Sequence, residues 1–306
     1  RMTTQIFHPF DELESISDPS SQAHDIIGDI MQENPPPSTT RIYVQNLNGV
    51  GWTKDRGKWP YICESIDAIQ ADISCFLEVN VDTNKYPVRT VMKSISQRQL
   101  VQNRLVMASS RSASSSPYQP GGMAILACHE ISTWIKSHTR DRMGRWSSIL
   151  VSSDNSRKIR IISAYQVCQS LRPGANTAAS QQYAQIIEEA AANDQITRLT
   201  PREAFICELQ AFIHQAQNNG DLILLVGDFN ETLSLPNSGM DRLATTCGLT
   251  DLFSVRIGSS NVPATYQRGT TRIDYVLLSP ELVHHVRAAG NEPFGYRVPS
   301  DHRGMF

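Results

Sequence analysis

The sequence predicts an α/β fold in which helices cover the faces of β-sheets. Short apolar runs typical of buried strands alternate with segments whose apolar residues recur at helical spacing. The composition does not change sharply anywhere within residues 41–306, so one large domain is expected there. Apolar residues make up 40% of the 306-residue chain and charged residues 19%, which is typical of a globular protein.

The elements are expected in a regular order. A first strand is predicted at 41–45 and a helix at 59–70, where Ile62, Ile66 and Ile69 lie at helical spacing. Further strands are predicted at 71–79, 105–108, 122–128, 147–152, 158–165, 221–226 and 273–278, and further helices at 181–192 and 201–218, the last beginning at a proline.

Residues 1–40 differ from the rest of the chain in charge. They hold seven acidic side chains and one arginine and end in Pro35–Pro37, which predicts an acidic, polar leader or linker. The whole chain has 28 basic and 30 acidic residues, so 27 and 23 of them remain in residues 41–306. This mildly basic domain is compatible with a polyanionic substrate.

The sequence shows no membrane or secretion signal. No apolar run approaches the roughly 18 residues that suggest a membrane span, and the first residues lack the pattern of a signal peptide. The six cysteines are scattered without a CxxC pair, which indicates buried free thiols in a reducing compartment. We therefore expect an intracellular protein without a membrane partner.

Five short polar motifs lie at or next to the ends of strand-like runs. They are QNLNG at 45–49, LEV at 77–79, GDFNE at 227–231, RIDY at 272–275 and SDH at 300–302. The ends of buried strands are where a fold can gather polar groups from distant parts of the chain. Together the motifs supply carboxylates, amides and an imidazole, which can hold a hard cation, activate a water and neutralise a phosphate.

Asp228 and Asn230 lie two residues apart and are expected to point to the same face. One interpretation is an ordinary turn capped by an aspartate. The other makes Asp228 the group that orients or deprotonates an attacking water, while Asn230 donates to that water or to a phosphate oxygen. Asn46 and Asn48 also share one face, either as a strand end that turns at Gly49 or as part of a polar site.

Asp274 and His302 are expected to form a pair. A lone histidine is most often a buried residue with satisfied hydrogen bonds, but here Asp301 precedes His302 and Asp274 lies at the end of another strand. An aspartate that accepts from one imidazole nitrogen fixes the tautomer and raises the pKa of the histidine. The imidazolium would then donate to a phosphate, where negative charge builds up in the transition state.

The order of these motifs and the strands beside them resembles the endonuclease/exonuclease/phosphatase superfamily, whose members have the DNase I-like fold. The combination of GDFN, RIDY and SDH carries this resemblance, which covers residues 41–306. The LNG step at 47–49 and the stretch GDFNETLS at 227–234 are most similar to endonuclease domains of non-LTR retrotransposons. The resemblance implies a four-layer sandwich, with two packed, mostly antiparallel β-sheets flanked by helices.

The resemblance also implies functions for individual residues. It makes Glu78 the ligand of a divalent cation, which we expect to be Mg²⁺ or Mn²⁺, and it places Asn48 near that metal. Because such a hard cation needs only one or two carboxylates, Asp301 is the natural second ligand. By the same resemblance, Asn46 contacts the catalytic aspartate or the phosphate, and Tyr165 contacts the phosphate.

Three positions depart from the pattern of the superfamily. Relatives have Gln-Glu where this chain has Leu77-Glu78, and many have Asp where it has Asn48. Relatives often have Ala-Pro-Asn after the tyrosine, where this chain has Gln-Val-Cys at 166–168. The metal ligand is retained, but the site carries less negative charge and the loop after Tyr165 is expected to differ.

Basic residues close to tryptophans are candidates for substrate contacts. Arg56 and Lys58 lie near Trp59, and Arg142 and Arg145 near Trp146. Interleaved bases and aromatics can follow a phosphate backbone and stack on nucleobases, although charged loops are usually just solvated.

The motifs together predict a metal-dependent phosphodiesterase that nicks DNA by in-line attack of water and leaves a 3′-hydroxyl, as expected of a retrotransposon endonuclease. The alternatives are a superfamily phosphatase or phosphodiesterase acting on inositol phosphates, lipids or nucleotides, and an inert nucleic-acid-binding module. The strand after His302 has only residues 303–306 to occupy. We therefore expect a nuclear domain that is cut from a longer polyprotein with a reverse transcriptase.

Overall fold

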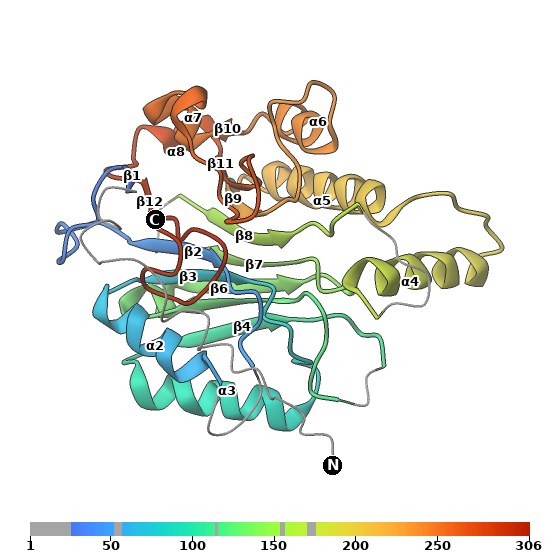
Figure 1. Cartoon of the computed structure of the whole chain (residues 1–306), viewed down its shortest axis with the longest axis horizontal. Coiled ribbons are helices and arrows are strands. Elements are labelled where there is room, and N and C mark those ends of the chain that lie inside the picture. Colours follow the sequence, from blue (N-terminus) through green and yellow to red (C-terminus); the bar gives the residue numbers. More distant parts are fainter. Residues whose placement is uncertain (1–25, 52–56, 114–115, 154–156, 170–175) are drawn as a thin grey trace, which may run out of the picture.

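The computed structural model describes residues 26–51, 57–113, 116–153, 157–169 and 176–306. Two β-sheets pack face to face around a shared apolar core, and helices cover the outer face of each sheet (Figure 1). Most neighbouring strands in both sheets are antiparallel. The predicted four-layer α/β sandwich is confirmed.

The smaller sheet has four strands in the order β2-β3-β5-β4. These strands are β2 (Ile42–Asn46), β3 (Ile73–Leu77), β5 (Met123–Ala127) and β4 (Arg104–Ala108), with β2 and β3 parallel. α2 (Trp59–Ala68) and α3 (Tyr86–Gln99) cover its outer face (Figure 1). α3 is a helix that the sequence pattern did not predict, because its β-branched and polar residues favour a helix only weakly. The packing of Val88 and Met92 on the sheet stabilises it.

The larger sheet has six strands in the order β10-β11-β9-β8-β7-β6. They are β10 (Thr250–Asp251), β11 (Asp274–Leu278), β9 (Leu222–Asp228), β8 (Ile159–Tyr165), β7 (Trp146–Val151) and β6 (Ile135–Arg140), with β8 and β9 parallel. On its outer side lie α4 (Ala178–Ala192), α5 (Pro201–Asn218) and α6 (Gly239–Thr246) (Figure 1). The predicted start of α5 is confirmed, because Thr200 and Glu203 form a capping box around Pro201.

The core explains why the strands appear in the sequence as continuous apolar runs. Both faces of each central strand are buried, so neither face needs polar side chains. Side chains from both sheets, among them Val44, Ile125, Ile149 and Val226, form the core between the sheets. Two further cores lie under α2 and α3 and under α5 and α6.

The carboxyl ends of β2, β3, β8 and β9 meet at one edge of the sandwich. In the larger sheet Tyr165, Asp228 and Asp274 lie side by side in register. A Cβ atom on Gly227 would lie 1.9 Å from the carbonyl oxygen of Ala164, so only glycine allows β8 and β9 to approach this closely. The fold therefore brings polar residues from distant motifs together at this edge.

Residues 26–40, which we expected to be leader, pack against the domain. β1 (Ile27–Gly28) pairs with β12 (Gly290–Asn291), and Asp29 forms an ion pair of 2.6 Å with Arg256. Residues 26–40 are therefore part of the fold, although they lie before the predicted domain boundary at residue 41. Composition could not reveal this contact, because backbone pairing does not depend on composition. The earlier part of the predicted leader lies outside the described residues.

Short elements complete the described chain, namely α7 (Leu252–Ile257), α8 (Pro280–Val283) and 3-10 helices at Glu130–Trp134 and Ser259–Asn261. Within the described ranges, no helix is both long and apolar enough to cross a membrane. All six cysteines are free. Cys63, Cys75, Cys128 and Cys247 are buried as predicted, whereas Cys168 and Cys207 are exposed, so the prediction of buried thiols is wrong for these two.

Candidate active site

Predicted site residues from five motifs meet at the edge where β2, β3, β8 and β9 end. The Asn46 side chain joins the two sheets, because its Nδ2 donates to Glu78 Oε2 at 2.7 Å and to Asp228 Oδ2 at 2.9 Å. The Nε2 atom of His302 lies 3.8 Å from the same Asp228 oxygen. After the role proposed for them below, we call these residues, with Asp274, the catalytic cluster: Asn46, Glu78, Asp228, Asp274 and His302.

His302 and Asp274 form the pair that the sequence predicted. His302 Nδ1 lies 3.0 Å from Asp274 Oδ2, and the side chains are 6% and 2% exposed. Burial lowers the pKa of His302, but the Asp274 carboxylate and its hydrogen bond, together with the charges of Asp228 and Asp301, outweigh burial and raise the pKa to about 9. The imidazole is therefore protonated at neutral pH, and its Nε2–H points away from Asp274.

The Asp228 carboxylate is buried as deeply as that of Asp274. Burial raises its pKa well above the ordinary value, and the Asp274 and Glu78 carboxylates raise it further against the opposing effect of His302. The backbone N–H of Asn230 donates to Oδ1 at 2.9 Å, while Asn46 donates to Oδ2. Both oxygens are thus held in place, and the group accepts a proton more readily than an ordinary aspartate.

Asn230 and Glu78 have strained backbones. Their φ angles are both +47°, in the left-handed region that non-glycine residues rarely adopt. Asn230 Nδ2 donates to the carbonyl oxygen of Gln166 at 2.8 Å, and the Cys168 thiol donates to Asn230 Oδ1 at 3.2 Å. Such strain costs free energy and often occurs at functional sites, where surrounding contacts hold it in place.

Tyr165 ends β8 directly beside Asp228. The side chain is buried, and burial raises the pKa of the phenol well above its ordinary value; the nearby Glu78 and Asp228 carboxylates raise it further. Tyr165 therefore remains protonated at neutral pH and can donate a hydrogen bond.

The carboxylates of this region suit a hard divalent cation. Ligand atoms of Glu78, Asp228 and His302 lie within 4.8 Å of one another. His302 Nδ1 is taken by Asp274, however, and hard divalent cations prefer oxygen ligands, so the carboxylates are the better ligands. Asp301 lies outside that group, but its Oδ1 is buried and has no hydrogen-bond partner among the described residues, which fits a metal ligand. Asn48 Nδ2 donates to Asp301 Oδ2 at 3.3 Å.

Lys58 connects two loops near the site. Its ammonium group donates to the carbonyl oxygens of Leu47 and Pro299, both at 3.2 Å, and burial lowers its pKa while Asp301 opposes that effect. This arrangement holds the loop after β2 against the loop that carries Asp301 and His302. The predicted substrate contact by Arg56 falls outside the described residues.

Arg142 and Arg145 do not lie in the catalytic cluster. The Arg145 side chain has no exposed surface and pairs with Asp141 at 2.8 Å and Glu208 at 2.5 Å. Arg142 pairs with Glu189 at 2.6 Å and with Glu208 at 2.7 Å. In this conformation Arg145 cannot contact a substrate, which corrects the prediction from sequence. We call this group the arginine cluster: Asp141, Arg142, Arg145, Glu189 and Glu208.

Several residues that support the site were not predicted. Ser300 Oγ donates to the carbonyl oxygen of Asn46 at 2.5 Å and accepts from the backbone N–H of His302 at 3.1 Å. Thr265 Oγ1 accepts from the backbone N–H of Asp274 at 3.0 Å. Ser300 belongs to the SDH motif, which could have indicated it, whereas nothing local marks Thr265.

Comparisons with known proteins show the family and the fold of this chain. Residues 45–302 match the Endonuclease/Exonuclease/phosphatase family. No curated protein matches the chain. The AP endonuclease LMAP from Leishmania major aligns over 98% of both chains, with a TM-score of 0.63 and 12% identity.

Two further solved structures share the fold. The 3′ phosphatase NExo from Neisseria, bound to a product DNA hairpin, aligns over 87% of this chain and 98% of its own, with a TM-score of 0.57 and 16% identity. The endonuclease domain of TRAS1, a telomere-specific non-LTR retrotransposon, aligns over 87% of this chain and 95% of its own, with a TM-score of 0.50 and 13% identity. At such identities the likeness shows the fold alone.

Proposed function

Because the chain belongs to the endonuclease/exonuclease/phosphatase family, we propose that it is a metal-dependent phosphodiesterase that nicks DNA. The observation that supports this proposal is the catalytic cluster, which combines a buried carboxylate, an imidazolium and a second carboxylate at one edge of the sandwich. In-line attack of water on a phosphodiester needs an acceptor for the proton of the water and donors for the charge on the phosphate.

Asp228 is proposed to orient the attacking water and to take its proton. Burial and the neighbouring Asp274 raise its pKa, and a carboxylate with a raised pKa accepts a proton more readily than an ordinary one. Hydrogen bonds from Asn46 and Asn230 hold the two carboxylate oxygens, so the base is oriented before the substrate binds.

His302, Asn230 and Tyr165 are proposed to donate to the non-bridging phosphate oxygens. Asp274 occupies His302 Nδ1, which leaves the Nε2–H for the substrate. A donor that acts only in the transition state typically contributes about 10²–10³ in rate.

A divalent ion, Mg²⁺ or Mn²⁺, would be held by Glu78 with Asp301 as the second carboxylate and Asn48 beside them. When bound, such an ion neutralises negative charge on the phosphate and the leaving oxygen. Without a cation, the carboxylates of the site would repel both one another and the substrate.

The proposed substrate is DNA, and the proposed product is a nick with a 3′-hydroxyl. The NExo structure holds a DNA hairpin, and the TRAS1 domain belongs to a retrotransposon, which supports DNA as the substrate of this chain. The likeness to TRAS1 also supports the narrower proposal of a retrotransposon-type endonuclease. Because NExo is a 3′ phosphatase, release of a terminal phosphate is the second candidate activity.

A plasmid assay tests the proposal. Supercoiled plasmid should be nicked with Mg²⁺ or Mn²⁺ and should remain intact with EDTA, and a polymerase should extend the nick without prior phosphatase treatment. The Glu78→Gln variant should need more Mg²⁺ for the same rate, whereas Glu130→Gln, on the exposed surface, should not.

Three outcomes would change the proposal. Undiminished nicking in EDTA would remove the metal from the mechanism. Phosphate release from a 3′-phosphorylated oligonucleotide or an inositol phosphate, without nicking, would favour a phosphatase. Neither activity, with intact DNA binding, would indicate an inert binding module.

A further inference from the structure

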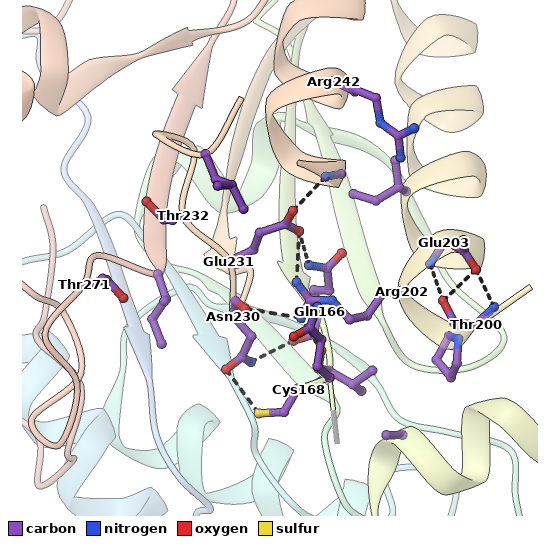
Figure 2. A pocket seen from close by; sticks show the side chains of 18 residues that line it. Gln166, Cys168, Thr200, Arg202, Glu203, Asn230, Glu231, Thr232, Arg242 and Thr271 are labelled. Carbon is purple, nitrogen blue, oxygen red and sulfur yellow. Dashed lines mark hydrogen bonds and ion pairs between the residues drawn. The ribbon is translucent and has the colours of Figure 1, made fainter. Parts of the chain in front are cut away.

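A cavity of about 560 Å³ lies beside Asn230 (Figure 2), and the proposed mechanism does not use the charged residues that line it. Its walls come from residues 166–169 after β8, residues 230–232 after β9 and the first turns of α5 and α6. Arg202 and Glu231 are the most enclosed charges in this wall, with side chains 15% and 14% exposed. Glu231 is also the last residue of the GDFNE motif, and it has no function assigned above.

Arg202 connects two loops through hydrogen bonds to three acceptor groups. Its Nη2 lies 2.9 Å from Glu231 Oε2, and its Nη1 donates to the carbonyl oxygens of Val167 at 2.8 Å and of Asn230 at 3.2 Å. One guanidinium therefore binds the loop after β8 and the loop after β9 at once. The planar fork of arginine suits such multiple contacts, which the point charge of a lysine does not reproduce.

Glu231 extends the connection to α6. Its Oε1 accepts from the backbone N–H of Gly239, the first residue of α6, at 2.7 Å, and its Oε2 accepts from Gln166 Nε2 at 2.9 Å. Figure 2 shows the Glu231 carboxylate between Gln166 and the start of that helix. The same Gln166 amide donates to the carbonyl oxygen of Phe229 at 2.7 Å. Both carboxylate oxygens are thus used to fasten the loop that contains Asn230.

Asn230 depends on the loops that this pair holds. Its side-chain amide is held by the Gln166 carbonyl oxygen on one side and the Cys168 thiol on the other (Figure 2). Its backbone adopts a φ of +47°, a conformation that persists only when surrounding contacts enforce it. Loss of the loop contacts would let the strained residue relax and turn its amide away from the phosphate.

We propose that Arg202 and Glu231 are a positioning pair that sets the orientation of Asn230. Neither residue touches the substrate in this proposal. Both act through Gln166 and Cys168, which bond the Asn230 amide directly. The inference rests on the proposed function, because it assigns the pair to the donor that stabilises the phosphate in that mechanism.

Nicking kinetics in the wild-type and the Asn230→Ala backgrounds test whether the pair positions Asn230. Arg202→Met and Glu231→Gln should each lower kcat for nicking by about 10- to 10²-fold with little change in KM, as expected from a small displacement of a catalytic group. In an Asn230→Ala background the same substitutions should lower kcat very little further, because the amide that the pair positions is gone. Glu203→Gln is the matched control, since Glu203 lies next to Arg202 but caps α5, and glutamine also serves in a capping box.

A thiol assay provides a measurement that does not depend on activity. In a Cys207→Ser background Cys168 is the exposed cysteine that remains, and iodoacetamide should alkylate it severalfold faster once Arg202→Met or Glu231→Gln frees its loop. Equal losses of kcat in both backgrounds, or unchanged alkylation of Cys168, would overturn the proposal. If the wild-type chain does not nick DNA, the proposed function fails, while the alkylation rates still decide whether the pair holds the Asn230 loops.

Discussion

The catalytic cluster and the arginine cluster both combine carboxylates with cationic side chains, but the arginine cluster comes closer to balancing their charges. Arg145 is held by Asp141 and Glu208, and Arg142 by Glu189 and Glu208, so each guanidinium has two carboxylate partners. In the catalytic cluster, three carboxylates surround one imidazolium. The arginine cluster also has one carboxylate more than it has guanidiniums, but Glu189 and Glu208 are 44% and 35% exposed, so water can solvate the excess charge. The larger and more enclosed excess of the catalytic cluster needs a cation from outside.

The clusters also differ in backbone strain and in the distance between their residues along the chain. The catalytic cluster joins residues from 46 to 302, and Glu78 in the cluster and Asn230 beside it adopt left-handed conformations. The core of the arginine cluster comes from one turn, where Asp141 pairs with Arg145 four residues later. Excess charge together with strain therefore distinguishes a candidate site for chemistry from a structural ion-pair network.

The largest expected effect is the loss of activity when the Asp274–His302 pair is broken. Asp274→Ala and His302→Ala should each lower the nicking rate by at least about 10², by analogy with removal of a transition-state donor. The double variant should be little worse than His302→Ala alone, because residues that act as a unit show non-additive losses. Rates of all variants should be measured at equal folded fraction, since loss of one partner can also destabilise a buried pair.

Two results would contradict that prediction. Multiplicative losses in the double variant would show that Asp274 and His302 act independently. Near-normal nicking by His302→Ala would remove the SDH motif from the active site.

The next effect should appear in stability rather than activity. Arg145→Met leaves the buried Asp141 carboxylate without its main partner, which should lower the free energy of unfolding by about 3–5 kcal/mol. Adding Asp141→Asn should recover part of this loss, because no unpaired buried charge then remains. Denaturant unfolding of the single and double variants measures both effects.

Measuring DNA binding by the Arg145→Met variant tests whether Arg145 is a structural residue or contacts the substrate. At equal folded fraction, its affinity and salt dependence should equal those of the wild-type chain. A decrease of about 0.9 in the slope of log affinity against log salt would instead show that Arg145 neutralises a phosphate.

The smallest expected effect is a pH-dependent contribution of Glu208 to stability. Burial raises the pKa of this carboxyl, but the hydrogen bonds and charges of Arg142 and Arg145 outweigh it and lower the pKa below 4.5. The folded pKa thus lies below the unfolded one, so the stabilisation is present above pH 4.5 and is lost as the pH falls through the folded value. Because the side chain is 35% exposed, the contribution should be about 1 kcal/mol or less.

Thermal unfolding at several pH values checks this expectation. The Tm difference between the wild-type chain and Glu208→Gln should be constant above pH 4.5 and should shrink below it. Glu188→Gln, on an exposed position of α4, is the matched control and should show no such trend. A difference that grows on acidification would mean that the ion pairs do not depress the Glu208 pKa.

Sequence patterns were most informative where one local feature decided the structure. The apolar runs before Glu78 and Asp228 are strands because both faces of those strands are buried, and α5 begins where Pro201 and its capping residues place it. The motifs at the ends of these strands could therefore be predicted to lie close together in space. α3 was missed because its helix depends on packing against the sheet rather than on propensity.

The sequence by itself determined the α/β class, the strands that carry the motifs and the Asp274–His302 pairing. Only the tertiary structure decided which charges are compensated. Arg145 beside a tryptophan has the same local pattern whether it faces DNA or the buried Asp141, and the acids Glu189 and Glu208 reach this cluster from α4 and α5. The contact of residues 26–40 with the domain and the link from Arg202 to Asn230 likewise join segments far apart in sequence. Such contacts depend on distance in space, which composition and periodicity do not encode.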